Sequence, residues 1–81
     1  MGQFYFHIRT GDELLTDDEG QNLPDLSAAR REAQLAAREL LAEAIKAGKE
    51  EVPEAFVIAD EAGLALEAVP LATVLPKALK K

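Results

Sequence analysis

The chain has 81 residues, no cysteine and a formal net charge of −6. A chain of this length forms one small domain, and without cysteine it has no disulfide, thiolate metal site or thiol nucleophile. No apolar run reaches the ~20 residues of a membrane span, and the start lacks the charged and then apolar pattern of a signal peptide, so we expect a cytoplasmic protein.

The first predicted element is a half-buried strand over residues 4–9, because apolar and polar side chains alternate there. One face carries Phe4, Phe6 and Ile8, and the other carries Tyr5, His7 and Arg9. Gly11-Asp12 indicates a turn, after which residues 14–16 resemble a short return strand. The acidic run Asp17–Gly20 ends that strand. Residues 21–23 should be extended, because the residue before Pro24 avoids helical conformation.

A long helix is predicted over residues 26–47, which contain neither Gly nor Pro and are rich in Ala, Leu, Glu and Arg. Asp25 or Ser27 can cap its start, and Gly48 suits its end. An apolar stripe follows the helical period, and it comprises Leu26, Ala29, Ala33, Ala36, Ala37, Leu40 and Ala44. Because this stripe is mostly alanine, the helix should lie close to a sheet.

A second hairpin is predicted after the helix. Residues 56–59 and 64–69 read as strands, and between them Asp60–Gly63 nearly repeats the acidic turn at Asp17–Gly20. Residues 71–75 can form a short apolar turn. We therefore place a single domain at residues 1–71, and a short apolar and then Lys-rich tail at residues 72–81.

These elements predict an α+β fold of the order ββαββ. A small antiparallel sheet would carry the single long helix on its Phe4, Phe6 and Ile8 face. The opposite sheet face, with Tyr5, His7 and Arg9, would then be left open to solvent or to a partner.

Several of these segments together resemble a family of small bacterial domains of unknown function, over about residues 4–71. The resemblance rests on the aromatic strand ending in His7-Ile8-Arg9, on Asp18-Glu19-Gly20, on Leu23-Pro24-Asp25-Leu26, and on Asp60-Glu61-Ala62-Gly63. The resemblance implies the fold boundaries and no site residues. The tail after Leu71 differs from the family pattern.

The open sheet face is the first candidate binding site. Tyr5, His7 and Arg9 would stand in a row about 7 Å apart along the strand. His7 is the only histidine, and beside Arg9 it could bind a small anion or act as a base. General acid–base catalysis also needs a partner and a pocket, so an exposed or interface histidine is the simpler interpretation.

The helix offers a second candidate contact surface, on the side opposite its main stripe. Ala28, Leu35 and Ala42 repeat every seven residues there, and Arg31 and Arg38 lie nearby at the same spacing. Leu35 is apolar where a polar residue is expected. This surface could contact an acidic partner or an acidic turn of a second copy, although a lone exposed leucine is also common.

Other chemistries find little support in the sequence. The acidic turns lack the ligand spacing of an EF-hand, and no Gly-rich phosphate loop, G-x-S-x-G or HExxH is present, so we expect no metal, no cofactor and no enzymatic activity. Acidic residues dominate residues 1–25 and 50–67, which disfavours nucleic-acid binding.

We therefore expect a small non-enzymatic interaction module. It would self-associate or bind a protein partner through the open sheet face. Two alternatives stay open: a regulatory domain that binds a small anion through His7 and Arg9, and an acidic partner that masks a basic protein, as small antitoxins do, through the acidic turns.

Overall fold

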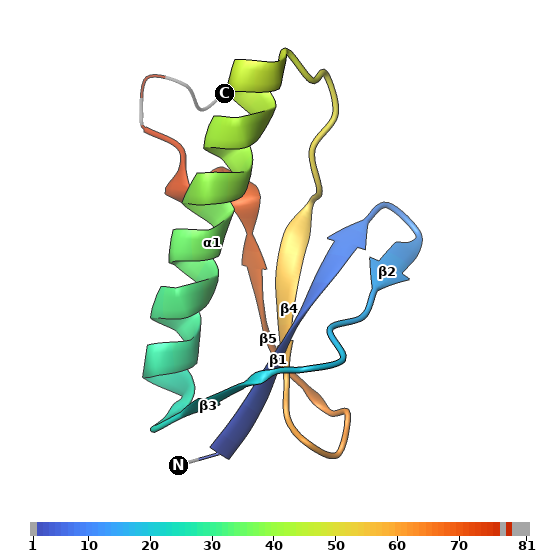
Figure 1. Ribbon diagram of the computed structural model, residues 1–81, viewed down its shortest axis with the longest axis vertical. Coiled ribbons are helices and arrows are strands. Elements are labelled where there is room, and N and C mark those ends of the chain that lie inside the picture. Colours follow the sequence, from blue (N-terminus) through green and yellow to red (C-terminus); the bar gives the residue numbers. More distant parts are fainter. Residues whose placement is uncertain (1, 77, 79–81) are drawn as a thin grey trace.

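The computed structural model describes residues 2–76 and 78. Its elements are β1 (Gly2–Thr10), β2 (Glu13–Leu15), β3 (Gln21–Leu23), α1 (Leu26–Ala47), β4 (Ala55–Ala59), β5 (Ala65–Pro70) and the 3-10 turn η1 (Leu71–Val74). The strands form one antiparallel sheet, and α1 lies along one of its faces (Figure 1). The predicted α+β class, with a single long helix on one side, is confirmed.

The sheet has the strand order β2-β1-β4-β5, and β3 also pairs with β1. β4 pairs with residues 5–9 of β1, while β2 pairs with residues 8–10 and β3 with residues 2–4. β2 and β3 thus follow one edge of β1 in succession, with the loop Asp17–Gly20 between them. Residues 21–23 were expected only to be extended, and their pairing with β1 adds a fifth strand.

The core lies between α1 and the sheet. Phe4 of β1, Phe56 and Ile58 of β4 and Val69 of β5 are buried there. The helix contributes Ala29, Ala33 and Ala37, each fully buried. Since an alanine projects only a methyl group, the backbone of α1 can approach the sheet closely, as the alanine stripe predicts.

Both ends of α1 are capped by local chemistry. Asp25 is the N-cap: its Oδ1 accepts a hydrogen bond from the Ala28 N–H at 2.8 Å, which satisfies a donor that the first turn leaves unpaired. Ser27, the other predicted cap, lies within the helix. At the other end Gly48 has φ 70°, and its N–H bonds back to the last turn.

The chain after β5 packs back onto the helix. Pro70 is the last residue of β5 rather than the residue after it, and it sits at the edge of the sheet, where a missing N–H is tolerated. Leu71 is buried and Val74 packs against the core. The predicted Lys-rich end falls on Lys77, Lys80 and Lys81, which lie outside the described residues.

Candidate functional site

Within residues 2–76 and 78, no helix lies over the face of the sheet opposite α1 (Figure 1). Directly paired residues on neighbouring strands share a face of the sheet. The register therefore groups the residues of this face into three rows across β1, β4 and β5: Tyr5–Ala59–Ala65, His7–Val57–Ala68 and Arg9–Ala55–Pro70. Tyr5, His7 and Arg9 stand on the open face, in the arrangement that the alternation predicts.

The β4 and β5 positions of this face carry no polar side chain. β4 reads Ala-Phe-Val-Ile-Ala from end to end, although an antiparallel strand with one wet face normally alternates apolar and polar residues. On β5 the open positions are also apolar, and Leu66 is 38% exposed. We call this surface the apolar strip, and it consists of Ala55, Val57, Ala59, Ala65, Leu66 and Ala68. Ala55 and Ala59 are already buried within the chain, so the exposed part of the strip is Ala65, Leu66 and Ala68, with Val57 half-buried beside them.

The three polar side chains of β1 are held by contacts within the chain. The Tyr5 ring lies against Gly20, where an added Cβ would stand 2.9 Å from Cε2 of the ring. The His7 Nδ1 accepts a hydrogen bond from the Asp17 N–H at 3.0 Å. In this arrangement the proton of the neutral imidazole is on Nε2. Tyr5 and His7 therefore fasten the loop Asp17–Gly20 to β1.

Arg9 is placed beside a carboxylate from the segment before β4. Its Nε lies 3.8 Å from Oε1 of Glu54, and both side chains are substantially exposed. The backbone reinforces the contact, because the Glu54 N–H donates to the Arg9 carbonyl at 2.8 Å. An ion pair in such a wet place is weak, yet it reduces the positive field that Arg9 would offer to an anion.

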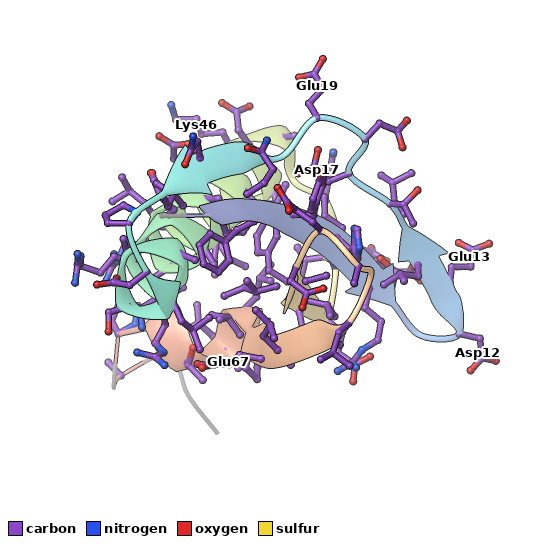
Figure 2. All side chains as sticks on the ribbon, turned by 90° about the horizontal axis from the view of Figure 1, so that it is seen from below. Asp12, Glu13, Asp17, Glu19, Lys46 and Glu67 are labelled. Atoms are coloured by element: carbon purple, nitrogen blue, oxygen red, sulfur yellow. The ribbon has the colours of Figure 1, made fainter. Side chains whose placement is uncertain are left out.

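Asp17 organises the loop, a role that the sequence reasoning missed. The Phe6 N–H donates to its Oδ2 at 3.1 Å, while the N–H groups of Glu19 and Gly20 donate to Oδ1 at 3.1 and 3.3 Å. Figure 2 shows Asp17 turned toward β1, whereas Glu19 of the same loop points outward. The Asp17 carboxylate thus replaces a strand partner for Phe6 in the gap between β2 and β3.

These hydrogen bonds decide the ionisation of the Asp17 side chain. Burial by itself would raise the pKa of Asp17, but the three backbone hydrogen bonds favour the charged form. The pKa of Asp17 is therefore below its ordinary value.

The near-copy turn at Asp60 works by the same chemistry. Its Oδ1 accepts hydrogen bonds from the N–H groups of Ala62 and Leu64, at 3.0 and 2.9 Å. Both acidic runs begin with an aspartate, and an aspartate at the start of a turn commonly bonds the backbone two residues on. This shared residue type was the sequence signal from which both roles could have been predicted. Both acidic runs thus use their first carboxylate to shape the turn.

One wide-open pocket, of about 300 Å³, lies between the start of β1 and the turn at Asp60, and its lining includes Gln3 and Glu61. Tyr5, His7 and Arg9 do not line it. Among residues 2–76 and 78, no group of three His, Asp or Glu side chains converges as metal ligands.

The second candidate surface is exposed on α1. Arg31 and Arg38 are exposed, and Leu35 between them is 52% exposed. Ala28 was expected to extend this surface, but it is only 9% exposed, because the first turn of α1 lies against β3. Ala42 at the other end of the stripe is exposed.

The fold and its surfaces define a small α+β domain with one covered and one open sheet face. The chain belongs to the family described as a domain of unknown function (DUF6894), whose model matches residues 3–72. Searches among curated proteins and among solved structures gave no match. Within the described residues, no helix is both long enough and apolar enough to cross a membrane.

Proposed function

We propose that this protein is a small non-enzymatic interaction module, and that its open sheet face binds a second copy of the chain. The observation that carries the proposal is the apolar strip, because two neighbouring strands without polar side chains on their open face are typical of strands covered on both sides. A domain of this size also buries only a modest core, and association is a common source of added stability.

The long and short side chains of this face are arranged so that the face is complementary in shape to a second copy of itself. The β1 residues Tyr5, His7 and Arg9 are long, whereas the β5 residues in the same rows, Ala65, Ala68 and Pro70, are short. A two-fold axis parallel to β4 would set the β1 side chains of each protomer over the short β5 residues of the other. Face-to-face sheets pack about 10 Å apart in this aligned manner. The apolar strips would meet at the centre, with the polar side chains at the rim.

The internal contacts of His7 and Arg9 support a binding role over a catalytic one. His7 already accepts the Asp17 N–H, and Arg9 lies beside Glu54. Small-anion binding, the first alternative, would have to compete with the Glu54 carboxylate. The antitoxin-like alternative would rely on the exposed Asp18, Glu19 and Glu61, because Asp17 and Asp60 are engaged in their turns.

The test places a charge in the middle row of the strip, on the edge strand β5. Ala68 is exposed and pairs with Val57, so Ala68→Lys can be accommodated in the free chain but would bury an unpaired ammonium in the dimer. We expect the dissociation constant of the sheet contact to rise at least about tenfold, which is about 1.4 kcal/mol. Sedimentation equilibrium across a concentration series would measure it.

Leu64→Lys is the matched control, because Leu64 is 63% exposed and lies in the turn before β5, outside the apolar strip. It adds the same charge and should keep the wild-type association. Equal masses for Ala68→Lys, Leu64→Lys and wild type at every concentration would refute the proposal, as would a wild-type protein that stays monomeric throughout.

A further inference from the structure

The outward surface of α1 sorts its charged side chains into two rows. Arg31 and Arg38 are seven residues apart, and Glu32 and Glu39 repeat that spacing. At 3.6 residues per turn, the arginines lie about 40–60° to one side of Leu35 and the glutamates about 40–60° to the other. The helix therefore presents a basic row, an apolar centre at Leu35 and an acidic row.

This sorting leaves the charges of both rows without partners on their own helix. Opposite charges support a helix when they are three or four residues apart. No residue at those distances from the two arginines is acidic, and none at those distances from the two glutamates is basic. Between residues 2 and 76 the structure forms ion pairs at Arg9–Glu54 and Arg30–Glu67, and neither uses a row residue.

We propose that this face binds a second copy of the chain, with the two α1 helices side by side and running in the same direction. A two-fold axis parallel to the helices brings the basic row of each protomer against the acidic row of the other. Arg31 and Glu32 are one residue apart, or about 1.5 Å along the axis, so they meet at almost the same level in the pair. Arg38 and Glu39 meet in the same way, and symmetry repeats each contact. An antiparallel pair would instead set like charges against each other.

The centre of the face has the shape that such a pair needs. Leu35 would contact its own copy at the two-fold axis. Seven residues further along stands the exposed Ala42, whose small side chain permits the close end of the usual 8–10 Å helix separation. Ala28, seven residues before Leu35, is buried against β3 and stays outside the contact, so Leu35 and Ala42 form the seam at heptad spacing.

A second copy is the occupant that uses both rows. Nucleic acid or an anionic membrane would be attracted by two arginines only, and the neighbouring glutamates and the net charge of −6 would oppose it. An acidic protein segment would meet the same opposition. A copy of this chain supplies both signs at the required spacing, which is electrostatic complementarity of the kind that selects a partner.

The helix contact is independent of the proposed sheet contact, because the two surfaces lie on opposite sides of the molecule. Its test is therefore made in chains that also carry Ala68→Lys, so that the sheet contact does not contribute. Failure of one proposal then leaves the other to be judged by its own variants.

The experiment uses two variants of this parent. Arg31→Glu with Arg38→Glu makes both rows acidic, and Glu32→Arg with Glu39→Arg makes both rows basic. We expect the parent to dimerise, each variant alone to bind itself at least tenfold more weakly, and the equimolar mixture to recover the dimer at low salt. Sedimentation equilibrium gives the masses, and circular dichroism confirms that each variant is folded.

Two controls separate this pairing from general attraction between charges. Glu19→Arg with Glu61→Arg makes the same charge change as the basic variant, but on two exposed loops, and should leave the parent dimer intact. Leu35→Asp in both members of the mixture should abolish its recovery, because the seam then buries two like charges.

A parent that stays monomeric would overturn the proposal, and so would variants that dimerise as the parent does. Recovery of the mixed dimer despite Leu35→Asp would also overturn it, since charge alone would then explain the attraction. Binding of a monomeric parent to phosphatidylserine vesicles, duplex DNA or a polyglutamate peptide, lost in the acidic variant, would assign the face to that occupant instead.

Discussion

At the residue scale, two positions in one loop hold the edge of β1 in place. Asp17 receives three backbone N–H groups, and Gly20 lies where the chain must pass close to the strand. Gly20 has φ +70°, and a Cβ there would stand 2.8 Å from the Phe4 carbonyl oxygen and 2.9 Å from the Tyr5 ring. Backbone conformation and space therefore both require glycine.

Gly20→Ala should be more destabilising than Gly11→Ala. Gly11 has φ +59°, so both substitutions carry the left-handed penalty of about 1–2 kcal/mol. Nothing lies within 4 Å of a Cβ at Gly11, whereas at Gly20 the clash adds a cost typical of overpacking, about 1–3 kcal/mol. Urea unfolding of both variants measures the difference. Equal losses in the free energy of unfolding would mean that β1 and the Tyr5 ring can shift to admit the added Cβ without destabilising the fold.

Asp17→Asn should lower the free energy of unfolding by about 1–3 kcal/mol at neutral pH, because the amide that replaces Oδ2 cannot accept the Phe6 N–H. The effect should depend on pH. The lowered pKa of Asp17 means that its charged form stabilises the fold above the unfolded-state pKa of about 4. That contribution is lost as the pH falls through the lower folded-state pKa.

Urea unfolding of wild type and Asp17→Asn at pH 7, 5, 4 and 3 tests this linkage. The difference between the two proteins should shrink below pH 5. A difference that is the same at every pH would show that the ionisation of Asp17 does not contribute to stability.

At the element scale, the alanine stripe of α1 sets the distance between helix and sheet. Ala33 and Ala37 are fully buried against side chains such as Phe56 and Ile58. The close approach also brings Arg30 within reach of Glu67 on β5, where its Nε and Nη2 bond the two carboxylate oxygens at 2.6 and 2.8 Å. The hydrogen bonds from Arg30 lower the pKa of Glu67 below its ordinary value.

Ala37→Leu should therefore destabilise the domain, by about 1–3 kcal/mol or more, because three added carbons have no space between α1 and β4. Ala47→Leu is the control, since Ala47 is exposed in the last turn and both residues favour helix. It should change the free energy of unfolding by less than about 0.5 kcal/mol. Thermal or urea unfolding distinguishes the two, and equal stability of both variants would contradict a tightly packed stripe.

At the scale of the whole molecule, the two proposed contacts lie back to back. The domain measures 36 × 24 × 20 Å. In Figure 1, α1 lies to the left of the sheet, so the outer face of α1 and the open sheet face point to opposite sides. Two different two-fold contacts on opposite sides of the domain do not produce a closed dimer when both are used. Sheet contacts and helix contacts would instead alternate along an open-ended stack of copies. Ala68→Lys would then leave pairs joined by helices, and the acidic α1 variant would leave pairs joined by sheets.

Much of the fold was predictable because its signals are local. Alternation marked β1, and the helical stripe marked α1. Gly11-Asp12 marked the turn of the first hairpin, and Asp60–Gly63 marked the turn of the second. Each signal depends on residues within a few positions of one another. The same locality explains why Tyr5, His7 and Arg9 could be placed on one face, and why Arg31, Leu35 and Arg38 could be placed on one side of the helix.

The sequence by itself thus determined the elements and the faces of each element, because side-chain period and turn chemistry act over short distances. Only the tertiary structure decided which strands are neighbours, and therefore that β3 pairs with β1 and that His7 accepts the Asp17 N–H. It also decided that the open positions of β4 and β5 join into one apolar strip. These contacts join residues distant in sequence, and the strand order that brings them together depends on the packing of the whole chain.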